Sequence, residues 1–154
     1  MLEEVFENKN VLFIGVKFYE YHLAIKQKME QYGAAVSFFA ERDTSILYGI
    51  VNRLLPQRID SFQKMHYESI LKAIAKKKFD YLLVVRGYRM PLSFVKTVKA
   101  RNPGIKTIMY QWDANVNSAY LNLDEEYNLI PEFDKVFSFD YKDVEQNPWI
   151  KYSP

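Results

Sequence analysis

The chain has 154 residues, of which 49% are hydrophobic and 26% are charged, and its formal net charge is +2 at pH 7. This length and composition indicate a single globular domain and exclude a disordered chain. The small net charge, without a long basic block, argues against nucleic-acid binding. The absence of cysteine excludes disulfides, thiolate zinc sites and a cysteine nucleophile.

The amino-terminal sequence and the hydropathy indicate a cytoplasmic protein. Residues 1–7 are too acidic for a signal peptide, and no apolar run approaches the length of a transmembrane helix. The only basic run, Lys76 to Lys78, is expected at the end of a helix, where it stabilises the helix dipole. The alternative is contact with an anionic membrane surface, so peripheral binding at the inner face of the membrane stays open.

Apolar runs alternate with helical patterns along the first half of the chain. Residues 11–14 are a continuous apolar run, which predicts a strand buried on both faces and ending at Gly15. A helix is expected next, with inward residues at helical spacing and Gly33 as its stop. Residues 35–39 predict a second strand with a polar exit at 41–43, and Thr44 or Ser45 caps a short helix that Pro56 ends.

The second half repeats this alternation. A longer helix is predicted over residues 59–77, and strands over 81–85, 107–110 and 135–139. Pro91 is placed to open the helix between the first two of these strands. Short helices are expected near 119–127 and 141–146, and residues 149–154 resemble an edge strand. The long helix is expected to turn one stripe inward: Ile59, Phe62, His66, Ile70 and Ile74.

This order predicts an α/β fold, a Rossmann-like three-layer sandwich with a mainly parallel sheet of about five to six strands. Residues 1–154 form one domain, in which the first strand is expected to be central. The carboxyl ends of parallel strands share one edge, so the residues that follow the strands are expected to meet there. The predicted site comprises Gly15, Phe18, Tyr19, Arg86, Gly87, Trp112, Asp113 and Asp140.

Four of the polar residues have two interpretations each. Asp113 follows a buried strand beside Trp112 and suits a general base, or it caps the next segment. Asp140 is more typical of a helix cap than of a binding residue. Arg86 binds an anionic group or pairs with a carboxylate. His66 is interpreted as packed, with a catalytic role as the alternative.

Several familiar sites are absent from the sequence. The residues after Gly15 do not complete a dinucleotide-binding Gly-x-Gly-x-x-Gly pattern, and no phosphate loop occurs. A phosphoacceptor receiver domain would need an aspartate where Arg86 stands. His22 and His66 are the only histidines and lie on helix stripes, so no metal site is expected.

Four segments together resemble a known family. They are residues 10–19, residues 79–87 (Phe-Asp-Tyr-Leu-Leu-Val-Val-Arg-Gly), residues 110–113 (Tyr-Gln-Trp-Asp) and residues 133–143, which begin Phe-Asp-Lys-Val-Phe-Ser-Phe-Asp. In this order they resemble the amino-terminal half of bacterial glycosyltransferase-like proteins of capsule, exopolysaccharide and lipopolysaccharide biosynthesis, similar to the spore-coat CgeB-type glycosyltransferases. The resemblance covers nearly the whole chain.

The resemblance implies one half of a two-domain GT-B enzyme that needs no bound metal. In such enzymes the amino-terminal half takes a sugar or glycolipid acceptor, and the carboxyl-terminal half binds the nucleotide-sugar donor. That donor half is expected on another polypeptide or in a longer protein, so this chain alone is expected to lack turnover and to bind no cofactor. The alternative is a non-catalytic α/β binding module that associates with itself through its carboxyl-terminal edge.

Overall fold

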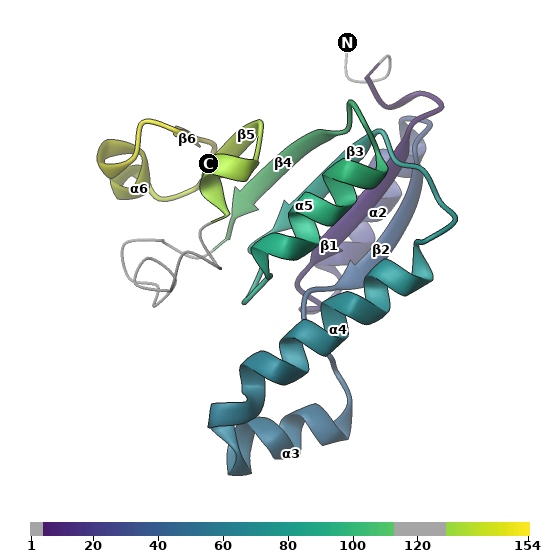
Figure 1. The fold of residues 1–154 in the computed structure, drawn as a ribbon. Coiled ribbons are helices and arrows are strands. Elements are labelled where there is room, and N and C mark those ends of the chain that lie inside the picture. Colours follow the sequence, from purple (N-terminus) through teal and green to yellow (C-terminus); the bar gives the residue numbers. More distant parts are fainter. Residues whose placement is uncertain (1–4, 113–128) are drawn as a thin grey trace.

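The computed structural model describes residues 5–112 and 129–154, and these form a single all-parallel sheet with helices on its faces (Figure 1). The strand order is β2-β1-β3-β4-β5-β6. The strands are β1 (Asn10–Gly15), β2 (Ala35–Ala40), β3 (Tyr81–Val85), β4 (Lys106–Gln111), β5 (Lys135–Ser138) and β6 (Ile150–Tyr152). The helices are α2 (Tyr21–Gln31), α3 (Ile46–Leu54), α4 (Ile59–Ala73), α5 (Leu92–Arg101) and α6 (Tyr141–Gln146), with short 3-10 turns at Pro56–Arg58 and Ile130–Glu132.

Two apolar cores, one on each face of the sheet, make the fold three-layered. On one face Met29 of α2 packs with Val11 and Phe13 of β1. On the other face Tyr67 of α4 and Phe94 of α5 belong to a larger core with alternate residues of β1 and β3. Figure 1 shows α5 in front of the strands and α2 behind them. The predicted α/β Rossmann-like three-layer sandwich is therefore confirmed.

The strand positions differ from expectation in one respect. Residues 11–14 are at most 1% exposed, as a strand covered on both faces requires. However, β1 lies second from an edge rather than at the centre, because β2 pairs on its outer side (Leu12 with Ser37) and β3 on its inner side (Leu12 with Leu82). This is the doubly wound order 2-1-3-4-5, whose reversal point lies between β1 and β3.

Local sequence determines several helix ends. Gly33 has a φ of +87°, the left-handed conformation that terminates α2 at low cost. Ser45 caps α3, and its hydroxyl accepts a hydrogen bond from the Tyr48 amide at 3.2 Å. Helix α4 ends at Ala73, before the predicted residue 77, and the buried Ile74 is its C-cap.

Ile59, Ile70 and Ile74 of the stripe predicted for the long helix are buried, but the middle of the stripe differs from the prediction. Gln63 and Tyr67 are buried, whereas Phe62 and His66 are half-buried. A pattern of apolar residues does not reveal this difference, because Gln63 is polar. His66 places Nε2 at 2.8 Å from the Ala40 carbonyl, which confirms its interpretation as a packed residue.

Helix α3 and the 3-10 turn after it project from the sheet together with the start of α4 (Figure 1). We call residues 45–58 the arm. Tyr48 and Val51 are its buried residues, and they face the rest of the protein. The arm therefore leaves one side of α3 uncovered.

No helix within residues 5–112 and 129–154 combines the length and the apolar character needed to cross a membrane. The basic run that follows α4 is partly engaged by the protein itself. Lys77 Nζ donates to Ser37 Oγ at 3.2 Å, and Lys78 Nζ donates to the Arg101 carbonyl at 2.5 Å.

Candidate functional site

The chain reverses its winding between β1 and β3. The β1–β2 connection runs through α2 on one face of the sheet, and the β3–β4 connection runs through α5 on the other. The loops after β1 and β3 therefore diverge, which opens the crevice where doubly wound folds bind ligands. We call the region between residues 16–20 and 86–90 the switch crevice.

Both loops of the switch crevice contain residues in the left-handed region of backbone space. Tyr19, Arg86 and Arg89 have φ values of 43°, 71° and 44°. Side-chain-bearing residues rarely adopt such conformations, which cost about 1–3 kcal/mol each and concentrate at functional sites. Gly87, at φ +74°, adopts the same region without that cost. The concentration of strain on these two loops supports the crevice as the candidate site.

Aromatic side chains line a cavity on the β1–α2 side of the switch crevice. A cavity of about 730 Å³ is lined by the residues Phe18, Tyr19, Glu20, Tyr21 and Ala24. The Phe18 and Tyr19 rings meet edge to face with centroids 4.5 Å apart. Trp112 contacts Tyr21 in the same way at 5.5 Å, which joins the end of β4 to the start of α2. The structure thus brings the predicted residues Phe18, Tyr19 and Trp112 into one region.

Sequence reasoning missed Tyr21 because it begins a helix whose inward stripe was assigned to other residues. Its signal was its position directly after a strand-end loop that already contains two aromatics. Tyr21 is 55% exposed, so it is available to a ligand as well as to Trp112.

The base of the β3 loop is held by a buried ion pair. Arg86 Nε donates to Glu41 Oε1 at 2.8 Å, and a second guanidinium nitrogen contacts the same oxygen. The other carboxylate oxygen, Oε2, accepts from the Tyr88 amide at 2.8 Å. The Glu41 side chain is 1% exposed and that of Arg86 is 17% exposed. Of the two interpretations of Arg86, pairing with a carboxylate is the one that the structure shows.

Glu41 was expected in a polar exit from β2, and its burial was missed. Its signal was its position directly after a strand, at the same edge of the sheet as Arg86. Gln63 of α4 secures this arrangement by donating to the backbone carbonyls of Glu41 and Tyr88. A buried amide in α4 thus holds together the ends of β2 and β3.

Tyr88 lies at the centre of a second polar cluster beside the arm. The guanidinium carbons of Arg42, Arg86 and Arg89 each lie 5.7 Å from its ring centroid, within the range of cation–π attraction. Arg89 also forms an ion pair with Asp60. Burial, with the neighbouring Tyr88, raises the pKa of Tyr48 to about 12, so that its hydroxyl stays neutral. This cluster joins the arm to the β3 loop.

The remaining predicted site residues lie at the base of the site or apart from it. Gly15 is buried at the end of β1, where its carbonyl accepts from the Glu41 amide at 2.9 Å. Gly87 is buried in the β3 turn, where an added Cβ would lie 3.0 Å from Val84 Cγ1. Asp140 caps α6 by accepting from the Lys142 amide at 2.8 Å, as its cap interpretation requires.

Asp113, the predicted general base, and the helix predicted over residues 119–127 lie outside the described residues. In the described part of the chain, histidine and carboxylate side chains form no group of three or more that could hold a metal ion. His22 is buried against the Phe38 ring, with centroids 4.8 Å apart. The cavity on the β1–α2 side of the crevice is lined by the rings of Phe18, Tyr19 and Tyr21, by the Glu20 carboxylate and by Ala24.

Comparisons with protein-family models, with curated proteins and with solved structures found no match to this chain.

Proposed function

We propose that this chain is the acceptor-binding Rossmann-like domain of a sugar transferase of surface polysaccharide or lipopolysaccharide biosynthesis. The observation that carries the proposal is the aromatic cavity on the β1–α2 loop, which borders the switch crevice and is lined by Phe18, Tyr19 and Tyr21. Its position matches the place where doubly wound sheets bind ligands. The order of strand-end motifs, which resembles glycosyltransferase-like proteins, supports the same function.

The chemistry of the cavity suits a carbohydrate. Sugar rings offer apolar C–H faces that pack on aromatic rings, and hydroxyls that bond to phenolic oxygens. Phe18, Tyr19 and Tyr21 are 51%, 79% and 55% exposed, so their rings are available for such contacts. A volume of about 730 Å³ can hold one or two sugar units.

In this proposal Asp113 acts as the general base. Its carboxylate takes the proton of an acceptor hydroxyl while that oxygen attacks the anomeric carbon of the donor sugar. The bond from the anomeric carbon to the nucleoside diphosphate breaks, and the diphosphate leaves with the bonding electrons. Trp112, directly before Asp113, would orient the acceptor ring.

Arg86 has a different role from the anion binding that was one of its two interpretations. Its guanidinium is occupied by Glu41, so it holds the β3 loop in place instead of binding a phosphate. The nucleotide-sugar would bind a second Rossmann-like half, as in the family that the chain resembles. The proposed setting is the cytoplasm, at the inner face of the membrane, where lipid-linked acceptors are found.

The proposal is tested by sugar binding to matched variants. Calorimetry with a panel of monosaccharides and disaccharides should detect binding that Phe18→Ala weakens about tenfold, the effect of losing one aromatic stacking contact. Phe139→Ala removes another exposed aromatic, 44% exposed and outside the cavity lining, and should leave binding unchanged. Equal effects of the two variants, or no sugar binding at all, would contradict the proposal.

Asp113→Asn tests the assigned base separately. In a reaction that contains the donor-binding half, this variant should lose transfer while the sugar affinity of the domain is retained, because the amide keeps the shape but cannot accept the proton. Full transfer by the variant would show that Asp113 is not the base.

A second candidate function, a non-catalytic module that self-associates, is favoured by the exposed edge of the sheet. Among residues 5–112 and 129–154, strand β6 pairs with β5 on one side and is the last strand of the sheet. Exposed aromatics surround it: Tyr141, Trp149 and Tyr152 are 62%, 73% and 50% exposed. Light scattering distinguishes the two functions, since a dimer disrupted by Tyr152→Pro supports edge pairing, whereas a monomer at all concentrations contradicts it.

A further inference from the structure

The arm and the neighbouring part of α4 expose several large apolar side chains. We call them the apolar stripe: Ile46, Leu47, Ile50, Leu54, Leu55 and Met65, whose exposures range from 44% to 84%. Successive helical residues are about 100° apart, so the four α3 members lie within one third of the circumference. Tyr48 and Val51 lie next along the circumference, at about 200° and 140° from Ile46, and are buried. Both groups of side chains are thus apolar, although only the second is covered.

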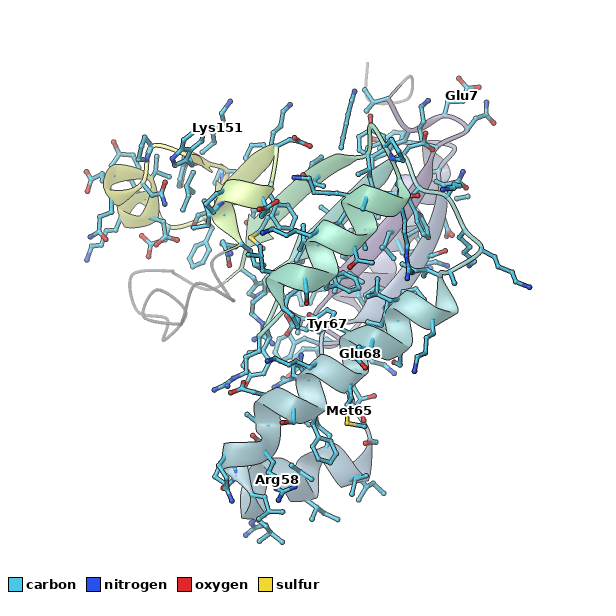
Figure 2. All side chains as sticks on the ribbon, viewed as in Figure 1. Glu7, Arg58, Met65, Tyr67, Glu68 and Lys151 are labelled. Carbon is cyan, nitrogen blue, oxygen red and sulfur yellow. The ribbon has the colours of Figure 1, made fainter. Side chains whose placement is uncertain are left out.

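The charges of the arm all have the same sign. Residues 45–58 contain Arg53 and Arg58 but no aspartate or glutamate. Both arginines are exposed. By helical angle Arg53 lies about 20° from Ile46, beside the stripe. Arg58 and Met65 lie on the same projecting part of the molecule (Figure 2).

We propose that the arm docks on the surface of an anionic lipid bilayer. A short helix with an exposed apolar side and arginines next to it is the pattern of a segment that lies in the membrane interface. The apolar stripe would enter the boundary between headgroups and acyl chains, and the arginines would bind lipid phosphates through their planar donors. The projection of the arm from the sheet lets it reach the surface without moving the core.

A second copy of the chain fits this surface less well. Stable protein interfaces take roughly 20–30 residues from each partner, whereas the apolar stripe has six. A symmetric contact through α3 would also bring the arginines of both copies together with no acidic residue on the arm to neutralise them. Anionic lipids supply the missing negative charge.

Docking would place the switch crevice near the membrane, because Tyr48 of the arm lies beside Tyr88 of the β3 loop. This last point rests on the proposed function, in which a lipid-linked acceptor enters the crevice. The docking itself does not, and its test requires no sugar.

The test measures flotation of the full chain with vesicles of phosphatidylcholine, alone or mixed with phosphatidylglycerol. Binding is expected only to the anionic vesicles, and it should weaken as salt is added. Ile46→Ser combined with Leu54→Ser should reduce binding at least about tenfold, since two exposed apolar side chains are lost. Arg53→Ala should reduce it about fivefold, the typical contribution of one basic residue near an anionic surface.

Lys76→Ala is the matched charge control. It removes one positive charge from the basic run after α4 and should leave binding unchanged. An equal loss in Lys76→Ala and Arg53→Ala would assign binding to general surface charge and overturn the proposal. Absence of binding to anionic vesicles would do the same, as would a concentration-dependent dimer that the Ile46→Ser, Leu54→Ser variant abolishes.

A fluorescent probe provides a second measurement, which does not depend on whether the serine variants fold. Because the chain has no cysteine, Leu47→Cys can carry a single environment-sensitive dye. Its emission should shift to the blue with phosphatidylglycerol vesicles, whereas the same dye on Gln31→Cys, exposed at the far end of α2, should not respond. Identical responses at the two positions would contradict insertion by the arm.

Discussion

Replacing Glu41 with alanine should destabilise the protein strongly. The variant leaves the Arg86 guanidinium without its carboxylate and removes the acceptor of the Tyr88 amide. Breaking a buried ion pair costs about 3–5 kcal/mol. We expect the lower part of that range, about 3 kcal/mol, because the Arg86 side chain is 17% exposed and can recover some hydration.

The loss is measured by urea unfolding and by thermal unfolding, both followed by circular dichroism. For a domain of this size, about 3 kcal/mol corresponds to a fall in Tm of roughly 6–12 °C. Asp60→Ala is the matched control, because it breaks the Arg89–Asp60 pair, whose side chains are 28% and 46% exposed. Such a pair should contribute no more than about 1 kcal/mol.

A double-mutant cycle with Arg86→Ala separates the pair from its surroundings. If the two residues stabilise each other, Glu41→Ala in the Arg86→Ala background should cost much less than in the parent protein. Additive losses, or a Glu41→Ala effect as small as that of Asp60→Ala, would refute the view that this pair holds the β3 loop.

Three further perturbations test particular elements. Gly87→Ala should cost about 1–2 kcal/mol of unfolding free energy because of the φ of +74°. Gly49→Ala should gain about 0.5–1 kcal/mol, because a Cβ added there in α3 meets no other atom within 4 Å. Similar chemical-denaturation midpoints for the two variants would contradict this. Asp140→Ala should cost about 1 kcal/mol by removing the α6 cap, and Asp140→Ser should restore most of it in the same assay. The pKa of Tyr48 is raised from 10 to about 12, so the folded state holds this proton more tightly than the unfolded state. The free energy of unfolding should therefore fall as the pH rises from 10 to about 12. Tyr48→Phe should reduce this fall when unfolding is measured as a function of pH.

Much of the fold could be predicted because it depends on neighbouring residues. The run at 11–14 had to be a buried strand, since four consecutive apolar residues leave no polar face. Ser45 and Asp140 were recognisable as caps because capping joins residues only two or three apart.

The missed features depend on residues far apart in the chain. Glu41 and Arg86 are 45 positions apart, so the burial of the carboxylate follows from a pairing that no local pattern reveals. The position of β1 beside the edge depends on which side β2 joins, which is a property of the assembled sheet. Gln63 faces the core because its side chain donates hydrogen bonds to two strand-end loops. The spacing of apolar residues along a helix does not reveal such bonds.

The central claim, that the switch crevice binds an acceptor sugar, is tested most directly by amide NMR of the isotope-labelled chain. The protein would be titrated first with a panel of sugars and then with nucleotide-sugars. The account predicts shifts at Phe18, Tyr19, Tyr21 and Trp112 with a sugar and none at these residues with a free nucleotide. Nucleotide shifts at the same residues, or sugar shifts confined to other parts of the sheet, would contradict it.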